Sequence, residues 1–330
     1  MLTIAKSPLR ISFFGGGTDY PDYFESYPGA VLGTAIDKYI YTIVLPMAEF
    51  AENRYRITYR VVEAVDSIQE IRHPVIRATL TALKFNDPLN IAILADVPGN
   101  SGLGSSSSFT VGFVRLIEHL RGRSISKLDL VKLASHIEHD ILGENVGIQD
   151  QIHAAFGGLN LYTFHKSDFG IQPIQLTTDT RDALNASLCL VFTGIHRHAS
   201  KALEEQMANT REKKIHTELS HLLALCKEGA ALLQREDSDA VMREFGRLLS
   251  EGWETKRKLS SSISTPKIDE VYETGMKLGA YGGKLCGAGG GGFFLFMAPP
   301  HVQPQMKDVF GANNFVKIAL EDNGAEILKR

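Results

Sequence analysis

A loop rich in glycine and serine restricts the possible folds of this chain more than any other feature of the sequence. Residues 98–108 read PGNSGLGSSSS, and they follow a compact apolar run at residues 90–95 that predicts a buried strand. Apolar side chains then recur at the spacing of one helix face from Phe109 to Leu120. The sequence therefore predicts a strand, a glycine-rich loop and a helix in direct succession.

Such a loop is suited to binding the phosphates of ATP. Glycines let backbone N–H groups approach a ligand, and the helix start adds unpaired donors and a positive dipole end. The loop is not a Walker motif, because no lysine precedes its serines, and not a dinucleotide motif, because Ser107 stands where a glycine is needed. A serine-rich helix cap after a flexible turn is the alternative. The candidate phosphate-binding residues are Asn100, Ser101, Gly102, Leu103, Gly104, Ser105, Ser106 and Ser107.

Two further glycine clusters lie near the ends of the chain. Residues 286–292 contain G-x-G-x-x-G, but a predicted strand follows instead of a helix, so the dinucleotide interpretation fails. So many glycines predict close approach to another loop or to a ligand, with Gly289 and Gly290 as candidate substrate contacts. Near the N-terminus a strand ends in a turn carrying Gly17, Thr18 and Asp19. Asp19 could accept hydrogen bonds from two sugar hydroxyls, or it could merely stabilise the turn.

A pair of carboxylates is the candidate reaction centre. Glu138 lies on a predicted helix, and Asp150 follows a break at residues 143–147. The break could fold both toward one site, where one holds Mg²⁺ and the other faces a substrate hydroxyl. Each carboxylate alone could also be a solvated surface charge. His136 and His139 have a possible metal spacing but no evident third ligand, so packing or surface roles are favoured.

Composition excludes several classes of protein. Lys and Arg number 35 and Asp and Glu 38, a balance that argues against a nucleic-acid binder. The three cysteines are far apart, which argues against a disulfide framework and fits a reducing cytosol. No apolar run is long enough for a membrane span, and the first 14 residues lack a signal-peptide core. We therefore expect a cytoplasmic protein with neither a nucleic-acid nor a membrane partner.

The order of the predicted elements favours an α+β fold. A cluster of polar and glycine residues near 163–180 suggests two domains, residues 1–170 and 171–330. Strands are expected at 9–14, 55–62, 187–192 and 293–297, a hairpin at 30–45 turning at Asp37-Lys38, and helices at 73–84, 128–142, 211–235, 238–259 and 268–278.

These motifs together resemble the GHMP kinases, which include galactokinase, homoserine kinase and mevalonate kinase. Residues 98–108 are similar to the ATP loop of the family, residues 7–20 to its N-terminal substrate motif, and residues 284–292 to its C-terminal glycine-rich motif. The three motifs occur in the family order, and the sequence Gly-Ile-Gln-Asp-Gln at residues 147–151 lies between the ATP loop and the C-terminal motif. The resemblance implies a ribosomal-protein-S5-like N-terminal domain that binds ATP and a ferredoxin-like C-terminal domain.

The resemblance also implies roles for individual residues. Asp150 matches the proposed catalytic base, with Arg10 as its basic neighbour. Ser106 and Glu138 match the residues that bind Mg²⁺, and Asp19 matches the aspartate that holds sugar hydroxyls in galactokinases. Galactokinases have Gly-Glu-His-Thr-Asp where this chain has Gly-Gly-Gly-Thr-Asp at residues 15–19, a departure that argues against galactose.

The Gly-Gly-Gly-Thr-Asp form and residues 192–197 look most like the D-glycero-D-manno-heptose 7-phosphate kinases, although fucokinases share parts of both. The implied reaction phosphorylates the anomeric hydroxyl of the sugar phosphate and supplies nucleotide-activated heptose for lipopolysaccharide or capsule. Arg197 is the first candidate for binding the substrate phosphate, and Lys201 and Lys284 are weaker candidates. A surface salt bridge is the equal alternative for Arg197. A kinase for a neutral sugar such as fucose, or a silent sensor of sugar and ATP, are the competing interpretations. Either a monomer or a homodimer is compatible with the sequence.

Overall fold

A long antiparallel pair of strands organises the first half of the molecule in the computed structural model, which describes residues 1–48, 51–99, 101–166, 168–195 and 200–328. Strands β1 (Thr3–Phe14) and β2 (Gly29–Pro46) pair along most of their length. The sheet has the order β12-β1-β2-β5-β3-β4, with β6 beside β2 and β7 beside β6. The other strands are β3 (Tyr55–Thr58), β4 (Val62–Val65), β5 (Leu89–Ala95), β6 (Leu159–His165), β7 (Asp168–Pro173) and β12 (Glu326–Leu328).

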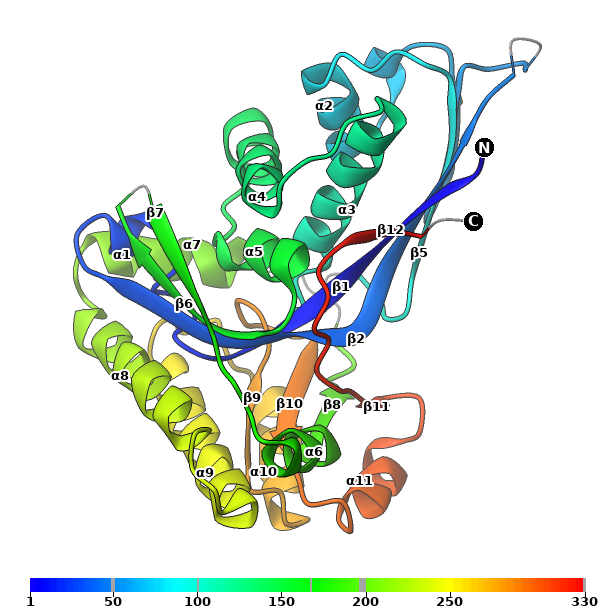
Figure 1. The fold of residues 1–330 in the computed structure, drawn as a ribbon. Coiled ribbons are helices and arrows are strands. Elements are labelled where there is room, and N and C mark those ends of the chain that lie inside the picture. Colours follow the sequence, from blue (N-terminus) through cyan, green and yellow to red (C-terminus); the bar gives the residue numbers. More distant parts are fainter. Residues whose placement is uncertain (49–50, 100, 167, 196–199, 329–330) are drawn as a thin grey trace.

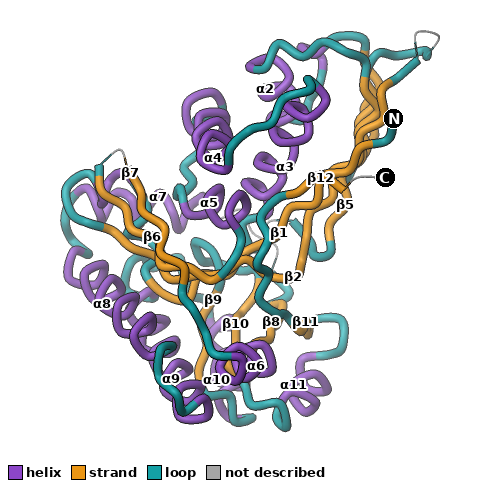
Figure 2. The backbone as a smooth tube through the Cα atoms, in the orientation of Figure 1, coloured by secondary structure: helices purple, strands orange, loops and turns teal. Residues whose placement is uncertain are grey.

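Helices cover both faces of this sheet around β1 and β2 (Figures 1 and 2). Helices α3 and α5 contact β1 on one side, and α8 contacts both strands on the other. Strand β1 is buried at nearly every position, as expected for a strand enclosed on both faces. The helices of this half are α1 (Pro21–Phe24), α2 (Pro74–Ala82), α3 (Ser105–Leu120), α4 (Lys127–Ser135) and α5 (Gln149–Phe156).

A second antiparallel sheet of order β11-β8-β10-β9 forms the other half. Its strands are β8 (Leu188–Phe192), β9 (Gly282–Leu285), β10 (Phe293–Met297) and β11 (Phe315–Lys317). The helices are α6 (Thr178–Ser187), α7 (Ser200–Arg211), α8 (His216–Leu232), α9 (Ser238–Lys256), α10 (Pro266–Lys277) and α11 (Gln303–Phe310). No helix within the described ranges is long and apolar enough to cross a membrane.

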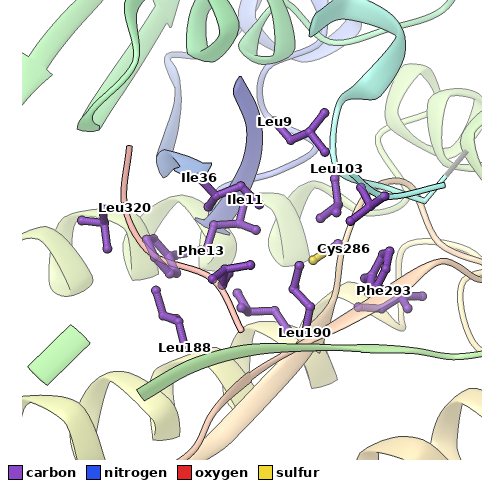
Figure 3. Packing of buried hydrophobic residues seen from close by; sticks show 14 of the residues in the cluster. Leu9, Ile11, Phe13, Ile36, Leu103, Leu188, Leu190, Cys286, Phe293 and Leu320 are labelled. Carbon is purple, nitrogen blue, oxygen red and sulfur yellow. The ribbon is translucent and has the colours of Figure 1, made fainter. Parts of the chain in front are cut away.

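One apolar core joins the two halves. Figure 3 shows side chains of this buried cluster, among them Leu9 and Phe13 of β1, Leu190 of β8 and Phe293 of β10, all of which are at most 2% exposed. The final strand, β12, returns to pair with β1. The sheets therefore share a packed interface, and the division at residue 170 stays a prediction.

The predicted hairpin at 30–45 is wrong, because these residues belong to the single strand β2. Pro8 pairs with Tyr39 and Leu9 with Ile36, so two extra residues bulge out of β2 at this point. Pro8 has no N–H to donate to the ladder, which favours a bulge opposite it. Asp37 is held there by two hydrogen bonds with the backbone of Ala319, of 3.0 and 2.9 Å.

Two other expectations differ in detail. The strand predicted at 55–62 consists of β3 alone, after which the chain turns into β4. The helix predicted at 128–142 changes to a π-helical segment at His136–Ile141. Such segments are rare overall but are often found at functional sites, and this one carries Glu138.

Candidate active site

A cavity of about 250 Å³ lies where the three glycine-rich loops meet. Gly15, Gly16 and Gly17 line one side, Gly102 and Gly104 another, and the loop after β9 a third. The structure thus brings together three segments that lie far apart in the sequence. The other walls come from β1, residues 145–147, α5, α7, α8 and α9.

Arg10 and Asp150 form a bidentate ion pair in the cavity wall. Strand β1 delivers Arg10, and the first turn of α5 delivers Asp150. The Arg10 Nε donates to Oδ1 of Asp150 at 2.8 Å, and Nη2 donates to Oδ2 at 2.9 Å. Burial lowers the pKa of Arg10, but the charge and hydrogen bonds of Asp150 outweigh burial and raise it above its ordinary value. The third guanidinium nitrogen, Nη1, donates to the carbonyl of Gly102 at 2.6 Å, which ties this pair to the phosphate loop.

The predicted strand, loop and helix are confirmed, but only part of the loop faces the cavity. Helix α3 starts at Ser105 behind Gly104, whose φ of 73° is in the left-handed region. No hydrogen bond from a described side chain caps its start, which leaves first-turn N–H groups to bind a ligand. Gly102, Gly104, Ser105, Ser106 and Ser107 line the cavity.

Two candidate phosphate-binding residues lie away from the cavity. The Leu103 side chain is fully buried in the core, and its carbonyl accepts the Arg10 N–H at 3.0 Å. Ser101 is 1% exposed, and its carbonyl accepts the N–H of Phe293. Both residues therefore fix the loop to its surroundings. Asn100 lies outside the described residues.

Glu138 is enclosed by neutral hydrogen-bond donors. Its side chain is fully buried and accepts from Ser107 Oγ at 2.9 Å, Thr110 Oγ1 at 2.7 Å and Gln151 Nε2. Burial raises the pKa of Glu138 to about 7, although the three hydrogen bonds act in the opposite direction. In the part of the chain that the structure describes, no cation pairs with this carboxylate.

Ser107, and not Ser106, is the hydroxyl that contacts Glu138. Ser106 is exposed in the cavity wall. Among the described residues no group of three or more His, Cys, Asp or Glu side chains could hold a metal, so the carboxylate has no protein co-ligands of this kind. A cation held at Glu138 would have to share ligands with a bound phosphate, which is how Mg²⁺ is commonly held.

The candidate sugar contacts Thr18 and Asp19 lie beneath the cavity and not in its wall, a correction to the sequence-based expectation. Asp19 is fully buried, and its carboxylate accepts from the Gly17 N–H at 3.0 Å and from Gln149 Nε2 at 2.8 Å. The backbone of Gly147 covers it. Burial raises the pKa of Asp19 to about 6. Both carboxylate oxygens are occupied by the protein, so Asp19 shapes the turn, whereas Gly17 does face the cavity.

Gly289 and Gly290 also lie away from the cavity. The Gly290 N–H donates to the carbonyl of Ile263 at 2.9 Å, and a Cβ on Gly289 would lie 2.8 Å from the Ile263 Cα. The expected close approach between loops is nevertheless confirmed, because a Cβ on Gly287 would lie 2.6 Å from the Cα of Gly102. Arg197 lies outside the described residues.

Several cavity residues were missed in the sequence. Lys256 and Gln206 line the cavity from α9 and α7 and are only 9% and 5% exposed. Lys284, weighed only as a minor alternative to Arg197, lines it from β9. A signal for Lys256 existed, because it lies on the apolar face of its helix, near Trp253 and Leu259, where a lysine is unusual. Gln206 carries no local signal, since it faces the cavity only because α7 packs over Gly17.

The comparisons with known proteins agree with this architecture. The model of the GHMP kinases N terminal domain matches residues 61–158, and that of the GHMP kinases C terminal domain matches residues 230–315. The D-glycero-alpha-D-manno-heptose 7-phosphate kinase of Campylobacter jejuni is 28% identical over 89% of each chain. The galactokinase of Thermotoga maritima is 24% identical, with 89% of this chain and 88% of that protein covered.

Solved structures share the fold. A D-glycero-D-manno-heptose 1-phosphate kinase from Bacteroides thetaiotaomicron superposes with a TM-score of 0.79 at 22% identity and covers 100% of this chain and 99% of that one. A galactokinase from Lactococcus lactis in complex with galactose gives 0.75 at 18% identity, over 98% and 95%. The family models, the two-domain α+β architecture and the meeting of the three glycine-rich loops lead to one conclusion: the chain belongs to the GHMP kinase family.

Proposed function

We propose that this kinase transfers the γ-phosphoryl group of ATP to the anomeric hydroxyl of D-glycero-D-manno-heptose 7-phosphate and forms the 1,7-bisphosphate. The similarity to the Campylobacter jejuni enzyme over 89% of both chains supports this substrate. Gly15, Gly16 and Gly17 add no side chains to the cavity, and a Cβ on Gly16 would meet nothing within 4 Å, so there is open space at this turn for a sugar larger than a hexose.

The observation that carries the proposal is the position of the Arg10–Asp150 pair beside the phosphate loop. Arg10 binds the Asp150 carboxylate through two nitrogens and the Gly102 carbonyl through the third. A carboxylate held in one orientation next to bound phosphates is arranged to accept a proton from an attacking hydroxyl.

The reaction is a direct in-line displacement. The sugar hydroxyl oxygen attacks the γ-phosphorus, the bond from that phosphorus to the bridging oxygen of ADP breaks, and the hydroxyl proton passes to Asp150. Arg10 orients the carboxylate and contributes positive charge near the transferring group. The N–H groups at the start of α3 and the hydroxyls of Ser105 and Ser106 bind the phosphates, so catalysis depends on positioning and electrostatics.

Ser106 and Glu138 are the residues that would hold Mg²⁺. A buried carboxylate that lacks a cationic partner among the described residues fits a hard divalent ion that takes its other ligands from phosphate and water. When bound, the ion neutralises charge on the phosphates during transfer.

Measuring ADP release against a panel of acceptors tests the proposal. The panel contains the heptose 7-phosphate, sedoheptulose 7-phosphate, mannose 6-phosphate, fucose and galactose. We expect the largest kcat/KM with the heptose 7-phosphate and a bisphosphate product. Turnover with neutral sugars alone would overturn the proposed substrate while leaving the kinase reaction intact.

A kinase for a neutral sugar is the second candidate. The L-fucokinase/L-fucose-1-P guanylyltransferase of Bacteroides fragilis is 25% identical over 98% of this chain, although the match spans only 38% of that longer protein. A silent sensor is disfavoured, because Arg10, Ser106, Glu138 and Asp150 are all retained. Turnover of ATP in the presence of any sugar on the panel excludes the sensor.

A further inference from the structure

Two lysines from the second half of the chain lie in the cavity wall and form no ion pair within the described part of the chain. Lys256 is the last residue of α9, and Lys284 lies in β9. They are 9% and 8% exposed and both line the cavity. Neither forms an ion pair with any residue that the structure describes. Lysines are seldom buried in this way unless an anion pairs with them.

Each ammonium group uses only part of its hydrogen-bonding capacity within the protein. Lys256 Nζ donates to the carbonyl of Leu285 at 3.1 Å and to that of Gly287. Lys284 Nζ donates to the carbonyls of Ser12 and Phe13 at 2.8 and 2.9 Å. Because an ammonium has three N–H donors, each lysine retains one donor beyond these contacts.

The two charges are costly to bury without an anion. Burial, followed by repulsion from Lys284, lowers the pKa of Lys256 to about 7. Burial also lowers the pKa of Lys284 to about 8. The nearby Arg10 adds to this repulsion, while its own charge is already matched by Asp150. The buried Asp19 carboxylate acts in the opposite direction on both lysines, although it forms no ion pair with either among the described residues. Arg10, Lys256 and Lys284 still exceed Asp19 and Asp150 by one positive charge, which an anionic ligand would neutralise.

We infer that Lys256 and Lys284 form a subsite for a phosphate group that the acceptor sugar already carries. The inference rests on the proposed kinase reaction and deepens it, since it assigns the acceptor to the class of phosphorylated sugars. The phosphates of ATP have their own donors at the start of α3, in the first half of the chain. The lysines instead come from α9 and β9, and Lys284 holds the end of β1 just before the Gly15–Gly17 turn.

Phosphoryl oxygens could also reach these lysines from the transferring γ-phosphoryl group, and the two sources are separable. A lysine that binds the phosphate of the acceptor discriminates between phosphorylated and unphosphorylated acceptors. A lysine that acts on the transferring group affects both acceptors equally. The informative quantity is the ratio of kcat/KM for the heptose 7-phosphate to kcat/KM for the same heptose without its phosphate.

Three variants make the test specific. Lys256→Met removes the charge and the donors at nearly constant volume. Lys256→Gln removes the charge but keeps N–H donors for the loop carbonyls. Lys258→Met, two residues further on at an exposed position, removes a charge outside the cavity and serves as the matched control. Thermal unfolding and the KM for ATP report whether the loop of Gly287 keeps its conformation.

We expect both Lys256 variants to lower the ratio at least about tenfold, mainly through the KM for the sugar phosphate, and Lys258→Met to leave it unchanged. Rescue of the ratio by Lys256→Gln would overturn the inference, because it would mean that the lysine only holds the loop. A constant ratio, with kcat/KM falling equally for both acceptors, would also overturn the inference. A wild-type enzyme that turns over sugars with no preference for the phosphorylated one would refute the subsite alone, whereas no turnover with any sugar would refute the kinase reaction.

Discussion

Two carboxylates twelve positions apart in the sequence occupy opposite kinds of environment. Asp150 is bound by a guanidinium through both oxygens, with its side chain 15% exposed at the cavity. Glu138 is fully buried and bound by two hydroxyls and an amide, all of them neutral. The carboxylate of Asp150 is thus paired with a cation, whereas that of Glu138 has no cationic partner among the described residues.

This difference separates two functions that the sequence alone assigns only by resemblance. A carboxylate in a bidentate ion pair has a fixed orientation, which suits a group that must meet a substrate hydroxyl. A buried carboxylate surrounded by neutral donors has a deficit of positive charge, which suits a group that binds a cation together with phosphate. The two carboxylates should therefore respond differently to removal of charge.

The largest expected effect is on turnover when Asp150 loses its charge. Asp150→Asn should lower kcat about 10³-fold, because no group remains to accept the hydroxyl proton. It should also destabilise the fold by on the order of 3 kcal/mol, since Arg10 becomes a buried cation without a counter-charge. ADP release and urea unfolding measure the two effects. Asp140→Asn, an exposed carboxylate, is the control, and turnover within tenfold of the wild type would rule out Asp150 as the base.

The pH dependence of the unfolding free energy should identify Glu138 as a carboxylate whose ionised form destabilises the fold. Its pKa is about 7 in the fold, against 4.5 for an ordinary glutamate. The folded state therefore binds the Glu138 proton more tightly than the unfolded state does. Protonated Glu138 makes its full contribution to the unfolding free energy below pH 4.5, and this contribution is lost as the pH rises to 7. In metal-free buffer, the unfolding free energy of wild type minus that of Glu138→Gln should fall by about 3 kcal/mol over this window. A flat difference would show that the carboxyl has ordinary acidity.

Turnover should also respond to Glu138, but through magnesium. Glu138→Gln should lower kcat on the order of 10²-fold and raise the Mg²⁺ concentration needed for half-maximal rate. Titration of activity with Mg²⁺ measures both, and Asp140→Asn on the same π-helical segment is the control. An unchanged Mg²⁺ requirement would exclude Glu138 as a ligand.

The smallest effect concerns the loop that links the two carboxylates. The Gly102 carbonyl accepts a hydrogen bond from Arg10, and the loop leads directly into α3, which carries Ser107 beside Glu138. The φ of Gly102 is 81°, and a Cβ there would lie only 2.6 Å from the carbonyl oxygen of Cys286, so Gly102→Ala should cost about 2 kcal/mol of unfolding free energy. Gly99→Ala, where a Cβ meets nothing within 4 Å, is the matched control. Equal stability of the two variants would contradict the close contact between the loops.

Features that depend on local sequence were predicted correctly. The strand, glycine-rich loop and helix at residues 89–120 follow from an apolar run, left-handed glycines and a helical stripe, all within one short segment. The resemblance of three ordered motifs indicated the family, and the pairing of Arg10 with Asp150 agrees with it. The crowded glycines at 286–292 correctly predicted that this loop meets another.

Features that depend on distant segments were decided only by the tertiary structure. Asp37 and Lys38 are residue types typical of a turn, but they form a bulge within β2, because Pro8 lies opposite them in β1. Asp19 is of a residue type that often binds ligands, but the backbone of Gly147 covers it. Lys284 reaches the carbonyl of Ser12 across 272 positions of sequence, so nothing local to either residue indicates the contact. Periodicity and turn chemistry act over a few residues, whereas burial, charge balance and the walls of a cavity are set by packing between segments that only the folded chain brings together.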